Sequence, residues 1–312
     1  MTGCEGAKGG AAHDEAVSSL STVVTFCNFS TPQAAAVFRL APGSGACSRV
    51  PLGFPHDVEG CTGITGNEER IYVLCISEGM HHLVALARDT LEFIFSQPLP
   101  EIKEGHSILA QGEHLYVVST GTDEVIRYRL ASKGLSDSRA VWRASLAGID
   151  THHVNSVALW EGNVVISAFG PRFGVLWTSA LEGYIHDISR DVRIKNGIYH
   201  PHSLSVRHDR LYYLESHRKL FCSLDGPLFA VPGYPRGVCW LSDDLVCIGS
   251  NVGRRLSKST GLIANPADPG AATGSCGITV GDVTRGRHVK RLDLGWVGGE
   301  IYDMLAESKS QG

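Results

Sequence analysis

Short apolar runs, bounded by Gly, Asp, Asn, Ser and Pro, recur along the whole chain, whereas long helical periodicity is hard to find. Runs of this length with period-two alternation are typical of β-strands. Five segments share one form, a strand, a short polar loop and a second strand: residues 22–40, 71–88, 115–130, 164–181 and 211–224. The pattern therefore predicts an all-β chain built from hairpins.

A further short strand, opening with a polar residue, precedes four of these hairpins in "EGCTGI", "HSILA", "HVNSVAL" and "HSLSV", and a fourth strand follows, as in "EFIFSQPL" or "AVWRASL". Four antiparallel strands repeated every ~40–50 residues are typical of β-propeller blades, because one such sheet is too small to bury both faces. The openings Glu59, His106, His153 and His202 are spaced by 47, 47 and 49 residues. Arg236 in "PRGVCW" and Glu300 in "GGEIYDML" supply a fifth and a sixth opening.

The last repeat ends after one strand, and the N-terminal hairpin lacks a first strand of its own. Pairing these two strands would close the ring and remove the free sheet edges of an open array. We therefore predict a six-bladed β-propeller over residues 21–306, closed by its N- and C-terminal strands. Residues 1–20 are expected to be a flexible N-terminal segment, 257–275 a loop insertion in the fifth blade, and 307–312 a C-terminal tail.

Composition narrows the classes of partner. The 312 residues carry a net charge of -4 with scattered basic residues, so neither nucleic acid nor an anionic membrane is expected as a partner. No signal-peptide core or membrane-spanning run is visible, which predicts a cytoplasmic protein. The nine cysteines lack zinc-ribbon or redox spacing, and Cys27, Cys75, Cys247 and Cys276 are expected to be buried thiols rather than nucleophiles.

The first strand of a blade is innermost, so the six opening residues are expected to form a ring at one end of the central channel. Three consecutive blades would then contribute His106, His153 and His202. Imidazoles that leave coordination positions open suit a transition metal ion, Fe, Cu or Zn, in a catalytic site. The alternative is structural: the rings would be hydrogen-bonded to carbonyls and to the two glutamates of a polar channel.

Other residues near the channel mouth receive roles by their chemistry. Arg236 would anchor an anionic group, and Glu59 or Glu300 would move a proton or add a ligand. Asn155 would hold substrate or a second-shell water, since it lies two residues after His153 on the same strand face. The loop residues Arg172, Tyr199 and Tyr234 are candidates for substrate contact, although solvated loop residues are the more common finding.

The repeat openings resemble those of the six-bladed gluconolactonase, strictosidine synthase and NHL-like propellers. A nearer resemblance is to an uncharacterised family of bacterial propeller proteins, carried by "HVNSVAL", "PHSLSV", "PGYPRG", "SCGITV" and "EIYDM" in the last half of the chain. That resemblance implies the fold and no particular activity. The lactonase group holds calcium with Glu, Asn and Asp ligands, whereas this chain places histidines at the corresponding openings, so calcium-dependent hydrolysis is not implied.

These observations favour a metal-dependent enzyme, an oxygenase or other oxidoreductase or a lyase, that acts on a small polar or anionic substrate at the channel mouth. The alternatives are a lactonase-like hydrolase and a non-catalytic propeller that binds a peptide or glycan through exposed aromatics such as Phe173. Small molecules or peptides are thus the expected partners, and the sequence leaves the substrate, the metal and the oligomeric state open.

Overall fold

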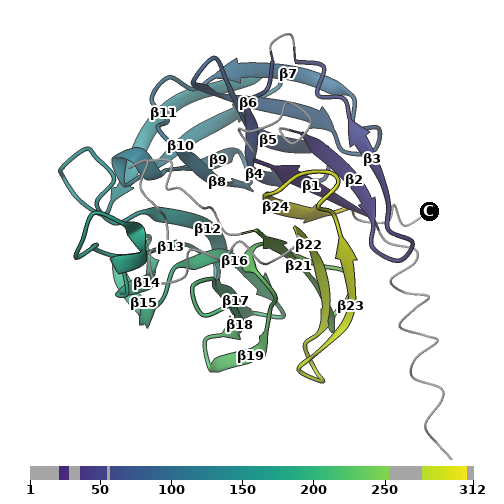
Figure 1. Cartoon of the computed structure of the whole chain (residues 1–312). Coiled ribbons are helices and arrows are strands. Elements are labelled where there is room, and N and C mark those ends of the chain that lie inside the picture. Colours follow the sequence, from purple (N-terminus) through teal and green to yellow (C-terminus); the bar gives the residue numbers. More distant parts are fainter. Residues whose placement is uncertain (1–20, 28–35, 55–56, 253–275, 308–312) are drawn as a thin grey trace, which may run out of the picture.

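The computed structural model describes residues 21–27, 36–54, 57–252 and 276–307. Their strands form six four-stranded antiparallel sheets, which confirms the predicted six-bladed β-propeller. Figure 1 shows β4, β8, β12, β16 and β24 around the centre, with β3, β7, β11, β15, β19 and β23 at the periphery. The predicted N-terminal segment (1–20), the insertion (257–275) and tail residues 308–312 lie outside the described residues.

The blades follow one another along the chain. The first comprises β4 (Gly60–Gly66), β5 (Arg70–Ser77), β6 (Met80–Ala87) and β7 (Phe93–Pro98). The second comprises β8 (Gly105–Gln111), β9 (His114–Ser119), β10 (Glu124–Ala131) and β11 (Gly134–Arg143), with the 3-10 turn η2 (Thr120–Thr122). The third comprises β12 (Val154–Trp160), β13 (Asn163–Ala168), β14 (Gly183–Asp187) and β15 (Val192–Ile198), with η3 (Trp177–Ser179).

The remaining blades complete the ring. The fourth comprises β16 (Pro201–Arg207), β17 (Arg210–Glu215), β18 (Leu220–Ser223) and β19 (Gly226–Ala230). The fifth comprises β20 (Tyr234–Trp240), β21 (Leu245–Asn251), β22 (Gly277–Asp282) and β23 (Arg287–Asp293). The sixth combines β24 (Ile301–Ala306) with β1 (Thr22–Phe26), β2 (Val37–Ala41) and β3 (Ala46–Val50). Thr22 pairs with Ala306 in the antiparallel register, so the two ends of the chain close the ring as predicted.

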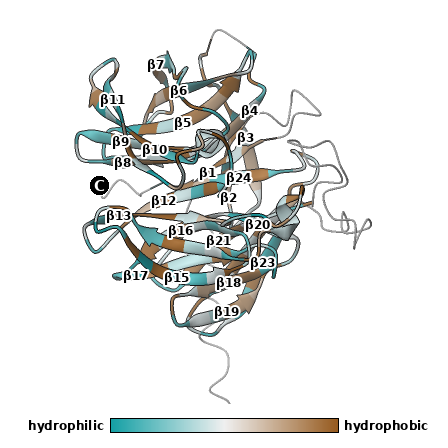
Figure 2. Ribbon diagram, turned by 90° about the vertical axis from the view of Figure 1, so that its left-hand side faces the viewer, coloured by the Kyte–Doolittle hydropathy of each residue, from teal (hydrophilic) through white to brown (hydrophobic). Residues whose placement is uncertain are grey.

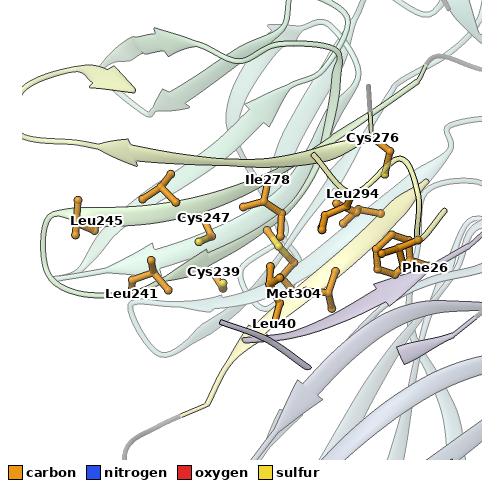
Figure 3. Packing of buried hydrophobic residues seen from close by; sticks show 14 residues of the cluster. Phe26, Leu40, Cys239, Leu241, Leu245, Cys247, Cys276, Ile278, Leu294 and Met304 are labelled. Carbon is orange, nitrogen blue, oxygen red and sulfur yellow. The ribbon is translucent and has the colours of Figure 1, made fainter. Parts of the chain in front are cut away.

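Apolar side chains fill the spaces between neighbouring blades. Figure 2 shows hydrophobic segments along the strands and largely hydrophilic turns between them. Between the fifth and sixth blades, Phe26 and Leu40 of the N-terminal strands pack with Met304, Cys247 and Ile278 (Figure 3). Cys27, Cys75, Cys247 and Cys276 are buried as expected. Burial raises the pKa of Cys276 to about 12, so its thiol is protonated at neutral pH.

Asn251 ties the fifth blade to the closing strand. Its buried side-chain amide donates to the Ile301 carbonyl at 2.8 Å and accepts from the Ile301 N–H at 2.7 Å. Asn251→Ala leaves both backbone groups without these partners, and we expect it to lower the free energy of unfolding by about 2 kcal/mol. Urea denaturation measures the change. Asn163→Ala, which removes only a local bond to the Glu161 carbonyl, is the matched control, and an equal loss in both variants would contradict the prediction.

Candidate active site at the channel mouth

Seven side chains, six from the first residues of innermost strands or directly before them and one from the β13–β14 connection, form a closed ring of contacts. Ring centroids, or the guanidinium carbon and a ring centroid, lie 4.5 to 5.5 Å apart at every step. In order, the members are Tyr302, His106, His153, Phe169, His202, Tyr234 and Arg236. Five blades thus contribute to one constellation, which we call the channel ring.

Strand register shows which of these positions are equivalent between blades. Ser107, Ser156, Ser203 and Asp303 each accept a hydrogen bond from a backbone N–H of the innermost strand in the next blade. The residues directly before them are His106, Asn155, His202 and Tyr302. We call the position shared by these four residues one level of the innermost strands. The register shifts in β4 and β20 place Thr62 and Arg236 at the same level. Asn155, rather than His153, is therefore the counterpart of His106 and His202.

His153 belongs to the preceding level. Glu104, His153 and His200 each lie two residues before one of these counterparts and share a left-handed backbone, with φ of +48°, +52° and +53°. The equal spacing in the sequence was therefore misleading for His153. Glu300 also lies two residues before its counterpart, Tyr302. The connections between blades differ in length: ten residues lie between β11 and β12, but only two lie between β15 and β16. Equal spacing in the sequence therefore does not place residues at the same level of the innermost strands.

All three predicted histidines donate from Nδ1 and direct Nε2 elsewhere. Nδ1 lies 2.7 Å from the Glu104 carbonyl oxygen in His106, 2.9 Å from the Asp150 carboxylate in His153, and 3.0 Å from the His200 carbonyl oxygen in His202. Carbonyl oxygens only accept, so the Nδ1 atoms of His106 and His202 must carry hydrogen. Such partners fix the orientation of an imidazole and leave the Nε2 lone pair for chemistry.

A phenylalanine separates two of the three histidines that are predicted to hold a metal ion. His106 and His153 meet edge to face, but Phe169 lies between His153 and His202, in contact with both. No group of three or more His, Cys, Asp or Glu side chains in the described ranges is placed to hold a metal ion. The three histidines therefore belong to one ring of contacts, in which His106 contacts His153 directly and Phe169 separates His153 from His202.

His202 is the most enclosed titratable group of the ring. Burial, followed by the positive Arg236 and the imidazoles of His200 and His153, lowers the pKa of His202 well below its ordinary value. The Ser216 hydroxyl, 2.8 Å from Nδ1, donates to the Pro235 carbonyl and so accepts from His202. The imidazole is therefore neutral, and its buried Nε2 has no hydrogen-bond partner among the described residues.

Arg236 lies across the ring from His153. Its Nη1 donates to the Glu300 carboxylate at 3.0 Å, and its guanidinium lies over the rings of Tyr302 and Tyr234. Both members of the ion pair are nearly buried, with side-chain exposures of 11% and 12%. The Nε of Arg236, like the Nδ2 of Asn155, is buried without a partner in the part of the chain that the structure describes. These groups provide hydrogen-bond donors that the fold itself does not use.

Other predicted site residues lie outside the ring. Glu59 is exposed and accepts from the Gly79 N–H in the β5–β6 turn at 3.1 Å. Arg172 is exposed over Trp177, and Tyr199 is covered by Arg218. Tyr234 alone of the predicted loop contacts joins the ring.

Sequence reasoning missed the aromatic side of the site. Phe169 stacks on His200 at 4.3 Å, and Trp177 lies 4.6 Å from His153. His200 donates from Nε2 to the Trp177 carbonyl at 2.9 Å and accepts from the Tyr234 hydroxyl at Nδ1. Phe169 and Trp177 lie in the β13–β14 connection, and their spacing carries no repeat signal. Tyr302 could have been found by aligning "YDM" with "HSI" and "HSL".

The sheets and the channel ring define the chain as a six-bladed β-propeller with a polar site at one channel mouth. Its residues 104–310 match the family described as a domain of unknown function (DUF4915), and the chain belongs to that family. No curated protein sequence matches the chain. Within the described residues, no helix has the length and apolarity needed to span a membrane.

Solved structures share the fold at low sequence identity. A chain of a nidogen/laminin complex aligns with a TM-score of 0.60 and 10% identity, over 92% of this chain and 98% of that one. A "putative 6-phosphogluconolactonase" from Bacteroides fragilis gives 0.57 and 9%, over 93% and 98%. A protein of the same description from Bacteroides uniformis gives 0.54 and 10%, over 92% and 99%. These likenesses confirm the predicted propeller class and extend to the fold alone.

Proposed function

We propose that the chain is a hydrolase that opens lactones of small hydroxy acids at the channel ring. One observation carries the proposal. The innermost strands of three successive blades carry Asn155, His202 and Arg236, and each has a buried polar atom without a hydrogen-bond partner among the described residues: Nδ2, Nε2 and Nε, respectively. The neutral imidazole of His202 is an acceptor, and the Asn155 amide and the Arg236 guanidinium are donors. Together they suit a ligand that has a hydroxyl group and a carbonyl or carboxylate group.

His202 would act as the general base. Its neutral Nε2 accepts a proton from water as the water oxygen bonds to the lactone carbonyl carbon. Arg236 holds the pKa of His202 down in the free protein, and negative charge that develops on the substrate would partly cancel that field. Formation of the oxyanion would thus strengthen the base as the proton moves.

Arg236 and Asn155 would bind the oxygen that gains charge. Donation from Arg236 Nε to the former carbonyl oxygen stabilises the tetrahedral intermediate. When that intermediate collapses, the ring C–O bond breaks, and the proton held by His202 passes to the leaving alkoxide. The products are a free hydroxyl group and a carboxylic acid, which releases its remaining proton to solvent and is retained as the carboxylate by Arg236. Glu300 would position Arg236 through their ion pair rather than take the proton, as its carboxylate is already engaged.

The metal-dependent oxidoreductase or lyase expected from the sequence is the second candidate. The observation in its favour is the shared Nδ1 donation of His106, His153 and His202, because imidazoles that bind metals through Nε2 are oriented by such a bond. Analysis of the purified protein for iron, copper and zinc separates the candidates. One equivalent of metal that His153→Ala loses would support the metal enzyme, whereas less than about a tenth of an equivalent would exclude it.

Lactone hydrolysis is tested by acid release from γ-butyrolactone and gluconolactone at constant pH. We expect saturable hydrolysis that Arg236→Gln reduces by about 100-fold in kcat/KM, because it removes a charged donor to the oxyanion. The control is Arg218→Gln, an arginine that stacks on Tyr199 outside the ring and should change kcat/KM less than twofold. If the wild type hydrolyses no lactone faster than the Arg236→Gln variant does, the proposal is wrong.

A further inference from the structure

Five large apolar side chains are more than 60% exposed, and the other exposed ones in the described residues reach at most 53%. All five lie in two kinds of connection, either leading into an innermost strand or joining a second strand to a third. They are Leu146, Ile149, Phe173, Val175 and Trp296. Because neighbouring strands are antiparallel, both kinds of connection emerge on the face that carries the channel ring.

Each of these connections also supplies a residue of the site. Leu146 and Ile149 precede Asp150, which binds His153. Phe173 and Val175 precede Trp177, whose ring packs on His153. Trp296 precedes Glu300, the partner of Arg236. Thus the most exposed apolar side chains of the described residues lie in the same connections as residues that line the site.

The β13–β14 connection holds its apolar residues in a defined position. Arg172 donates to the Val175 carbonyl at 3.2 Å and lies over Trp177, while the Gly174 N–H donates to Ser179 Oγ at 2.9 Å. The hydrogen bond from His200 Nε2 to the Trp177 carbonyl holds the end of this loop in place. Phe173 and Val175 therefore project from a hydrogen-bonded loop that is attached to the channel ring. Leu146 and Ile149 precede β12, and Phe173 and Val175 follow β13. We call these four residues the apolar rim.

We infer that the substrate is amphipathic: a hydroxy-acid lactone whose polar ring enters the channel ring and whose alkyl chain lies on the apolar rim. This inference rests on the proposed hydrolysis. Arg236, Asn155 and His202 satisfy the polar end, and the four side chains of the rim are all apolar. Each methylene transferred from water to such a surface improves binding by up to about fourfold.

The test compares γ-butyrolactone with γ-octalactone and γ-decalactone, which share the ring and differ in alkyl chain. For the wild type, kcat/KM should rise at least about tenfold from the four-carbon to the eight-carbon lactone. The double variant Phe173→Ser/Val175→Ser should lose most of that gain and keep its activity on γ-butyrolactone. Val192→Ser, at an exposed valine that begins β15 beside the β14–β15 turn on the opposite face, is the matched control. Thermal unfolding checks that the double variant is folded.

The outcomes separate the two claims. Hydrolysis of γ-butyrolactone with no gain from chain length overturns the amphipathic substrate and leaves the proposed hydrolase standing. Failure to hydrolyse any lactone removes the proposed function and this inference with it. If the double variant instead converts a dimer into a monomer in sedimentation, the rim is an interface between copies of the chain, and the inference is wrong.

Discussion

Asp303→Ser is expected to raise the free energy of unfolding at pH 8 by up to about 4 kcal/mol. Asp303 occupies the level at which three other blades carry Ser107, Ser156 and Ser203, and all four side chains accept an interblade N–H. Burial raises the pKa of the Asp303 carboxyl to about 7, because two backbone N–H donors, from Met304 and Ile64, do not offset the lost hydration. A serine would keep the acceptor without the charge.

The sign of the pH dependence follows from that raised pKa. The unfolded carboxyl releases its proton near its ordinary value of 3.8, whereas the folded one holds it up to about pH 7. The folded state therefore binds more protons between these values, and the wild type gains stability from this group as the pH falls from 7 toward 4. A difference of roughly three pKa units corresponds to about 4 kcal/mol, which is the full penalty above pH 7.

Urea denaturation at pH 8 and at pH 5 measures the effect as the difference between Asp303→Ser and wild type. Below pH 6.5 the neutral buried imidazoles of His81, His200 and His202 act in the opposite direction, since protonation destabilises their folded environments. They are common to both proteins and cancel in the difference. We expect the advantage of the variant to shrink between pH 8 and pH 5. An advantage independent of pH would show that the carboxyl is not the cause.

The fold was predictable from the sequence because its information is local and repeated. Each hairpin carries its own turn residues, and a ring of blades follows from counting them. The closing pair was also predictable: residues 22–26 lacked an innermost partner and residues 301–306 lacked outer ones, which left one arrangement without free edges. Burial of Cys75 and Cys247 followed from their apolar strands.

The site was less predictable because it depends on register and on side chains that do not repeat. Hydrogen bonds between blades, rather than residue counts, make Asn155 the counterpart of His106. Phe169, which separates His153 from His202, directly follows the second strand of its blade and has no counterpart in the spacing. The exceptional Asp303 could have been recognised once "YDM" was aligned with "HSI", "NSV" and "HSL". The ring residues Arg236 and Tyr234 were expected for their chemistry, but their contacts required the structure.

His202→Gln is expected to lower kcat/KM for γ-butyrolactone by about 1,000-fold, within the range attributed to a general base. Glutamine retains a polar side chain of similar reach but cannot take a proton from water near neutral pH. Burial and the positive Arg236 lower the pKa of His202 well below its ordinary value, so the base stays neutral where an exposed imidazole takes up a proton. The acid limb of the wild-type kcat/KM profile should therefore lie well below pH 6.5.

A matched control separates the chemistry of His202 from the cost of removing any buried imidazole. His186 is also buried, and burial lowers its pKa as well, but it bonds Asp191 and packs on Trp142 at the other end of the third blade. His186→Gln should change kcat/KM less than twofold. Equal losses in the two variants would mean that folding, not proton transfer, explains the effect. An acid limb near pH 6.5 in the wild type would assign the base to a less enclosed group, because desolvation beside Arg236 cannot leave His202 with an ordinary pKa.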